Sequence, residues 1–325
     1  MNNVLVTGGC GYVGSGIVHL LNKKKYNITV IDNLVNGSKK LLPKRITFIK
    51  SNINNTKFLK KKLKNKKFDL VIHCAAYADA RESEKKINIY YNNNFFYAKK
   101  FLIFCKSIGI KNYIISSTCA VYAPTTKKVS EKSKIEPISI YGKSKIKLEN
   151  FLIKLSNNNN LNYCILRYFN VAGADKSKKY GVISKKNNSL IKECCRRFLT
   201  NQNINIFGNN FFTKDGTTIR DYIHINDLSD IHFLITKKIL KFKINKIFNC
   251  GYGVGYSSKE IANYFVKLSK NKIKIVFKGK KKGDLPISVS NNLKILKFLK
   301  WKPKFNNIKV ILNDSLNWEK FLNEK

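Results

Sequence analysis

The sequence predicts an α/β fold, in which a doubly wound parallel sheet is accompanied by a smaller C-terminal α/β part. Two observations support this prediction. Over the first half of the chain, short β-prone apolar runs alternate with segments of helical periodicity, which is typical of βαβ units. The last third is more irregular, because seven glycines interrupt it between Gly208 and Gly283.

The expected elements follow in chain order. Strands are predicted at 4–6, 28–31, 46–49, 70–73, 113–117 and 163–168, and helices at 17–21, 95–108 and 140–155. In a parallel sheet covered on both faces, functional groups belong at the carboxyl ends of the strands. Thr118 and Asn170 each follow one of these strands and are therefore candidates.

A glycine-rich loop connects the first strand to the first helix. Gly8 permits a tight turn, Gly11 lets the backbone approach a pyrophosphate, and Gly14 lets the helix pack closely. The helix N-terminus then offers free N–H groups to phosphates. Asp32 ends the next strand about 20 residues later, where a carboxylate accepts from ribose hydroxyls and disfavours a 2′-phosphate. We therefore expect a Rossmann-type site for NAD rather than NADP.

Tyr141 and Lys145 form a second motif, four residues apart on a predicted helix. At this spacing the two side chains share one helix face. A free tyrosine has a pKa of about 10, and a neighbouring ammonium and the positive nicotinamide ring favour its phenolate. Tyr141 is thus a candidate proton acceptor for a sugar hydroxyl.

Composition gives weaker information about function. The chain has 325 residues and a formal net charge of +44, but only six of its 63 basic residues are arginine and the lysines are scattered. We interpret them as solvated faces and expect no specific nucleic-acid partner. None of the eight cysteines forms a Cys-x-x-Cys pair, so we expect reduced thiols and no metal site. With a strand starting almost at Met1 and no apolar run of membrane-spanning length, we expect a cytoplasmic protein without a membrane partner.

The ordered motifs resemble the extended short-chain dehydrogenase/reductases, and among them the UDP-hexose 4-epimerases. Besides the two motifs above, the resemblance rests on 73–76, 90–94, 116–122, 166–170, 206–208, 215–217, 220–224 and 283–286. Related 4,6-dehydratases carry an Asp-Glu pair after the Ser/Thr, whereas this chain has Cys119 and Ala120, which disfavours dehydration. The resemblance implies a Rossmann-type NAD-binding domain (1–175 and 221–254) and a UDP-sugar-binding domain (176–220 and 255–325).

The same resemblance implies the reaction and the residues that perform it. Tyr141 would take the 4-hydroxyl proton of UDP-glucose or UDP-galactose, Thr118 would hydrogen-bond the same oxygen, and Lys145 would hold the nicotinamide ribose. Tightly bound NAD would contact Gly8, Gly11, Tyr12, Val13, Gly14, Asp32, Asn33, Asn36, Asn52, Ile53, Cys74, Ala75, Ala76, Asn93, Lys145 and Tyr168. Substrate would contact Thr118, Tyr141, Asn170, Ser189, Leu190, Asn205, Phe207, Arg220, Lys281, Asp284 and Ser288.

Several positions depart from the pattern of that family. Asn52 stands where an acidic residue usually meets the adenine amino group, and we expect weaker recognition through its carbonyl oxygen. Lys281 replaces a second diphosphate arginine and lacks its planar fork. Ser189 stands where Asn or His is commoner. Ser288 replaces a bulky tyrosine of some members, so UDP-N-acetylhexosamines would fit unless neighbouring residues fill the gap.

The sequence leaves alternatives open for the substrate, the reaction and the oligomeric state. The same chemistry on UDP-xylose and UDP-arabinose is a near alternative that the sequence does not separate well from hexose epimerisation. A dehydrogenase that releases NADH is a second alternative. The family is commonly a homodimer that pairs two helices, here about 90–108 and 141–155. Their apolar residues serve either that contact or the protein's own core: Phe95, Phe96, Phe101, Leu102, Leu148, Phe151 and Leu152.

Overall fold

The computed structural model describes residues 2–183, 189–281 and 283–324, and its contacts divide the chain into two compact units. Unit 1 comprises residues 1–121, 137–168 and 229–248, and unit 2 comprises 122–136, 169–228 and 249–325. Both units are discontinuous in sequence.

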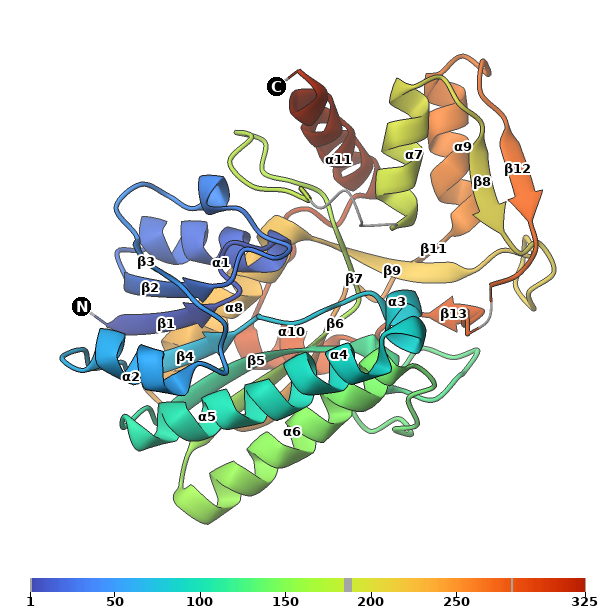
Figure 1. The fold of residues 1–325 in the computed structure, drawn as a ribbon. Coiled ribbons are helices and arrows are strands. Elements are labelled where there is room, and N and C mark those ends of the chain that lie inside the picture. Colours follow the sequence, from blue (N-terminus) through green and yellow to red (C-terminus); the bar gives the residue numbers. More distant parts are fainter. Residues whose placement is uncertain (1, 184–188, 282, 325) are drawn as a thin grey trace. The chain divides into compact units, whose positions relative to one another are not determined.

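A seven-stranded sheet forms the centre of unit 1, in the order β10-β6-β5-β4-β1-β2-β3. Figure 1 labels its strands β1 to β6. All pairings from β6 through β3 are parallel. The strands are β1 (Asn3–Thr7), β2 (Asn27–Asp32), β3 (Thr47–Lys50), β4 (Leu70–His73), β5 (Asn112–Thr118), β6 (Asn162–Tyr168) and β10 (Asn245–Cys250). The doubly wound α/β fold is therefore confirmed.

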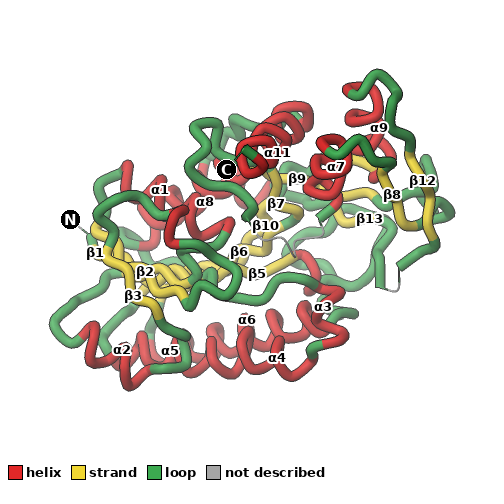
Figure 2. Tube along the Cα trace, turned by 45° about the horizontal axis from the view of Figure 1, so that its top comes forward, coloured by secondary structure: helices red, strands yellow, loops and turns green. Residues whose placement is uncertain are grey.

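Helices cover both faces of this sheet. Figure 2 shows α2 (Thr56–Leu63), α5 (Ala98–Ser107) and α6 (Ile140–Asn159) on one side, and α1 (Tyr12–Lys23) and α8 (Ile225–Ile239) on the other. The helix predicted at 95–108 is longer than expected. It begins with α4 (Ile87–Tyr91), which follows α3 (Ala80–Lys85), and passes through a π-helical segment, Asn92–Tyr97, before α5.

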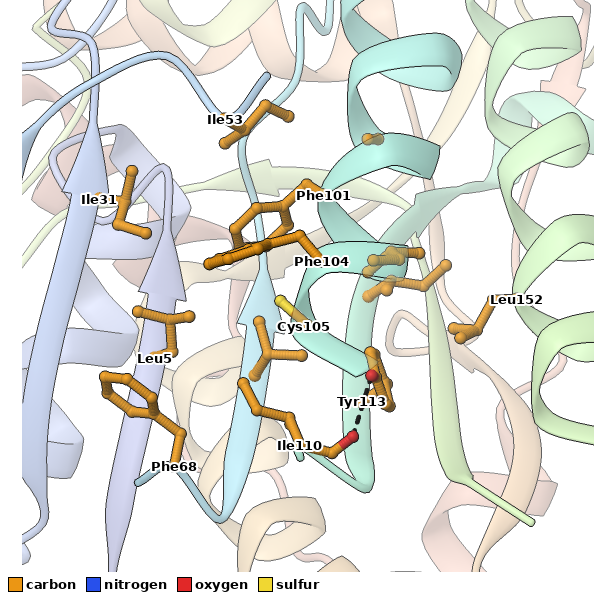
Figure 3. Packing of buried hydrophobic residues seen from close by; sticks show 14 of the residues in the cluster. Leu5, Ile31, Ile53, Phe68, Phe101, Phe104, Cys105, Ile110, Tyr113 and Leu152 are labelled. Carbon is orange, nitrogen blue, oxygen red and sulfur yellow. Dashed lines mark hydrogen bonds between the residues drawn. The ribbon is translucent and has the colours of Figure 1, made fainter. Parts of the chain in front are cut away.

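The main core of unit 1 lies between the sheet and the helices α2, α5 and α6. Figure 3 shows Leu5, Phe101, Cys105 and Leu152 converging there, with the Tyr113 hydroxyl donating to the Ile110 carbonyl at 3.0 Å. The apolar helix residues predicted to serve either a dimer contact or the protein's own core occupy both buried and exposed positions. Phe101, Leu102, Leu148 and Leu152 are buried in the protein's own core, Phe95 and Phe151 are partly buried against it, and Phe96 is 52% exposed.

Unit 2 contains two small sheets. In the first, β9 (Ile219–His224) pairs with β7 (Asn170–Ala172), β11 (Gly255–Ser257) and β13 (Ile287–Ser288); in the second, β8 (Ile204–Phe207) pairs in parallel with β12 (Ile275–Lys278). Its helices are α7 (Leu190–Leu199), α9 (Ser258–Leu268), α10 (Leu293–Leu299) and α11 (Ile308–Asn323). A capping box between Ser257 and Glu260 starts α9. Ile191, Ile206, Phe265 and Leu312 belong to one buried cluster that holds several of these elements together.

Candidate active site

A pocket in unit 1 lies at the carboxyl ends of β1, β2, β3 and β4. This is the edge at which open parallel sheets bind ligands. The pocket is lined by Gly8, Gly11, Ile31, Asp32, Asn33, Val35, Asn36, Gly37, Ser51, Asn52, Ile53, Cys74, Ala75, Ala76, Tyr77 and Asn93. Most of the residues predicted to contact the cofactor are thus brought together, although they come from segments up to 85 residues apart.

The glycine loop is shaped by close backbone approaches. Gly8 has a φ of +70°, and a Cβ there would lie 2.6 Å from the Ala75 backbone nitrogen. A Cβ on Gly14 would collide with the Gly8 carbonyl oxygen, so glycine is needed for α1 to start against the loop. Gly11 directly precedes α1 and has no side chain to cap its first N–H groups. These groups are therefore suited to a pyrophosphate.

Asp32 holds the loop in place and faces the same pocket. Its carboxylate accepts from the Cys10 N–H at 3.0 Å and the Leu34 N–H at 2.8 Å. Burial raises the pKa of Asp32, and the two backbone hydrogen bonds oppose that rise. Each oxygen keeps lone pairs that ribose hydroxyls could meet.

Asn52 already uses the oxygen that was expected to meet adenine. Its side-chain carbonyl accepts from the Asn54 N–H at 3.2 Å, and Asn33 makes the same kind of turn with Val35 at 3.1 Å. A carbonyl oxygen has two lone pairs. One acceptor position of Asn52 is therefore left for a ligand, and the weakened adenine recognition stays a prediction.

Five residues predicted to touch the cofactor do not line this pocket: Tyr12, Val13, Gly14, Lys145 and Tyr168. The first three form the start of α1, where we expect backbone N–H groups, and not side chains, to contact the cofactor phosphates. Conversely, Ile31, Val35, Gly37, Ser51 and Tyr77 line it and were not predicted. Of these, only Gly37 offered a sequence signal, namely a glycine shortly after Asp32. The structure shows why glycine is needed there, since a Cβ would lie 2.6 Å from the Cys10 carbonyl oxygen.

Thr118, Tyr141 and Lys145 form a second constellation in unit 1. Thr118 ends β5, whereas Tyr141 lies in the first turn of α6, whose N-cap Ser139 accepts from the Gly142 N–H at 3.0 Å. The Tyr141 N–H donates to the Ser83 hydroxyl at 3.1 Å. The Thr118 hydroxyl accepts from the Ala120 N–H at 3.1 Å and is hydrogen-bonded to Tyr141. Its own proton is thus available to the Tyr141 oxygen.

Burial dominates the protonation of this pair. It raises the pKa of Tyr141 to about 12, and the hydrogen bond from Thr118 opposes that rise. It lowers the pKa of Lys145 to about 8, against the raising effects of Cys74 and Glu149. Burial therefore outweighs the hydrogen bond from Thr118, and Cys119 raises the pKa of Tyr141 further. Lys145 is not among the groups that shift this pKa, which differs from the lowering expected from a lysine one turn away.

Unit 2 contains the residues predicted to bind the rest of the substrate. Ser189 is the N-cap of α7 and Leu190 its first residue, and Asn170 begins β7. Asn205 and Phe207 lie on β8, and the Lys281 ammonium lies 3.1 Å from the centre of the Phe207 ring.

Two further predicted substrate residues meet across a strand pair in unit 2. Arg220 on β9 is paired in register with Ser288 on β13, and its guanidinium donates to the Ile219 carbonyl at 2.9 Å. Asp284 lies in the loop before β13, and its N–H donates to the Lys281 carbonyl at 3.3 Å. Within the described ranges 2–183, 189–281 and 283–324, no group of three or more His, Cys, Asp or Glu side chains is arranged to hold a metal ion.

Residues 4–251 match the NAD dependent epimerase/dehydratase family. The chain belongs to this family. A UDP-glucose 4-epimerase of Azospirillum brasilense is 34% identical over 99% of this chain and 93% of its own length. No helix in the part of the chain that the structure describes has the length and apolar character needed to cross a bilayer.

Solved structures agree with this assignment. The UDP-glucose 4-epimerase of Bifidobacterium longum, in complex with NAD+ and UDP, superposes with a TM-score of 0.92 at 27% identity, covering 98% of both chains. The UDP-Glc/GlcNAc 4-epimerase of Campylobacter jejuni superposes with a TM-score of 0.84 at 34% identity, covering 99% of this chain and 100% of that one.

Proposed function

We propose that this protein interconverts UDP-glucose and UDP-galactose, with tightly bound NAD as its cofactor. The observation that carries the proposal is the hydrogen-bonded Thr118–Tyr141 pair, with Lys145 one turn further along α6, in a member of the epimerase/dehydratase family. The glycine loop supports NAD as the cofactor, because Gly8 and Gly14 let the loop pack against the Ala75 backbone and the start of α1, which puts the helix N-terminus beside the pocket.

In the proposed reaction, Tyr141 accepts the proton of the sugar 4-hydroxyl and later returns it. Thr118 donates to the same oxygen, and Lys145 holds the nicotinamide ribose and keeps a positive charge near the phenolate. NAD, when bound, takes the hydride from C4 and returns it to the other face of the bound 4-keto sugar. In unit 2, Arg220 would hold the diphosphate, Phe207 would lie near the uracil, and Asn170 and Leu190 would line the pocket.

The test is a Tyr141→Phe variant assayed for conversion of UDP-galactose to UDP-glucose. Removal of the base should lower kcat by about 10²- to 10⁴-fold, while NAD stays bound because the glycine loop and Asp32 are untouched. Tyr26→Phe, at a half-buried tyrosine outside the predicted site residues, is the matched control. Undiminished turnover in Tyr141→Phe would refute the role of Tyr141.

UDP-N-acetylhexosamines are a second class of substrate. Ser288 lies in register with Arg220 on β9, and because serine is much smaller than tyrosine, we expect it to leave room for a 2-acetamido group. The Campylobacter jejuni protein, described as a UDP-Glc/GlcNAc 4-epimerase, is 34% identical. We expect turnover of UDP-N-acetylglucosamine by the unmodified protein and its selective loss in Ser288→Tyr, with UDP-glucose turnover retained. No turnover of the acetylated sugar would exclude this substrate.

We further propose a cytoplasmic homodimer that serves galactose metabolism. Four apolar side chains in α4, the π-helical segment and α5 are exposed by 44–52%: Ile87, Ile89, Phe96 and Ile103. Burial of such a face against a second copy would remove it from water. Phe96→Asp should shift the protein from dimer to monomer in light scattering, whereas a monomeric unmodified protein would refute the proposal.

A further inference from the structure

A buried ion pair lies directly beside the catalytic residues of unit 1 and has no role in the proposed reaction. Glu149 on α6 and Arg167 on β6 are 1% and 3% exposed, and an Arg167 terminal nitrogen lies 2.6 Å from a Glu149 oxygen. The Arg167 Nε–H also donates to both carboxylate oxygens, at 3.1 and 3.2 Å. The Ser117 hydroxyl on β5 donates to the same carboxylate in a short hydrogen bond.

This carboxylate joins the three elements that carry the reaction. Ser117 directly precedes Thr118 on β5, and Arg167 directly precedes Tyr168 on β6. Glu149 lies one helical turn beyond Lys145 and two beyond Tyr141, on the same face of α6. A small rotation of α6 that moved Lys145 or Tyr141 would therefore break hydrogen bonds of Glu149.

Stability alone is a poor explanation for a charged pair at this position. A buried ion pair is often replaced by apolar residues of similar volume without loss of stability, because desolvation offsets the attraction. The neighbourhood of Lys145 supplies a chemical reason to keep the charge. Cys74 and Glu149 raise the pKa of Lys145 against its burial, and Lys145 in turn lowers the pKa of the neutral, buried His73. Of the two groups that raise the pKa of Lys145, Glu149 is the carboxylate and Cys74 is a thiol.

We propose that Glu149, clamped by Arg167 and Ser117, is a positioning residue that fixes α6 against β5 and β6 and holds Lys145 in its charged form. The inference rests on the proposed function, since it assigns Lys145 a charged role in catalysis. Removal of the carboxylate should lower the pKa of Lys145 below its value of about 8. Lys145 would then lose its charge at a lower pH, and the Tyr141 phenolate would lose its support.

The experiment is the pH dependence of kcat for UDP-galactose in variants of this pair. Glu149→Gln removes the charge and leaves Arg167 unpaired, which threatens folding, so Glu149→Gln/Arg167→Met removes both charges as a second variant. Glu149→Asp keeps the charge. Leu59→Ala, at a fully buried leucine of α2, is a control that loses core packing without altering charge.

We expect the descending limb of the profile to move to lower pH in both charge-removing variants, so that kcat above that limb falls. Glu149→Asp and Leu59→Ala should keep the limb of the unmodified protein, even where their stability is lower. An unchanged limb in the double variant, or an equal shift in Leu59→Ala, would overturn the proposal. An unmodified protein without epimerase activity would instead refute the proposed function itself.

Discussion

Replacement of Thr118 by valine tests the hydrogen bond on which the proposed base depends. Valine has nearly the same shape as threonine but lacks the hydroxyl. In the structure this hydroxyl accepts from the Ala120 N–H at 3.1 Å and is hydrogen-bonded to Tyr141. The substitution therefore removes two interactions at once, and they affect different quantities.

The two losses have separate magnitudes. A hydrogen bond to a charged group contributes about 1.5–3 kcal/mol, so kcat should fall about 10- to 150-fold when the phenolate loses its donor. The Ala120 N–H loses its acceptor, which should lower the free energy of unfolding by about 1 kcal/mol. Because Thr118 lowers the pKa of Tyr141, the ascending limb of the pH–kcat profile should move to higher pH.

Thr118→Ser is the matched control, because it keeps the hydroxyl and removes only a methyl group. Steady-state conversion of UDP-galactose across a range of pH gives kcat and the limb, and urea unfolding gives the change in stability. We expect Thr118→Ser to keep most of the activity. Equal kcat values for the valine and serine variants would refute the assignment of Thr118 as the donor to Tyr141.

Gly14→Ala should reduce the amount of bound NAD and lower the free energy of unfolding by about 1–3 kcal/mol, because the new Cβ meets the Gly8 carbonyl oxygen. The control Gly109→Ala, where φ is +85° and nothing lies within 4 Å of the new Cβ, should keep its NAD. Equal NAD content in the two variants would contradict the loop geometry. Burial lowers the pKa of His73 and His232 to about 3, so protons bind the unfolded chain first and stability should fall as the pH drops from 6.5 towards 3. At pH 5 each histidine should account for about 2 kcal/mol of this loss, and a His232→Gln variant with the same pH dependence of urea unfolding would contradict its part.

The fold was predictable because the signals for it are local. The apolar runs around Val4, Ile72 and Ile114 are short and bounded by polar residues, and the apolar residues of each run are buried in a strand. The glycine loop and the Tyr141–Lys145 spacing are likewise contained in single segments.

Other features depend on contacts between distant segments and had no such signal. The Glu149–Arg167 pair joins a helix to a strand 18 residues away, and nothing in the sequence distinguishes Glu149 from a surface carboxylate. The chain also crosses between its two units repeatedly, so that 122–136 packs with unit 2 and 229–248 with unit 1. The π-helical segment that carries Asn93 was not predicted, because such segments are rare and the sequence here predicts an ordinary helix.

The central claim is that NAD stays bound and returns to its starting state in every cycle. The most direct measurement denatures the purified protein to quantify released cofactor, alongside conversion of UDP-galactose to UDP-glucose with no NAD added. We expect near-stoichiometric NAD and sustained turnover without added cofactor. Accumulation of NADH, with turnover that stops when NAD is consumed, would show a dehydrogenase and contradict the account.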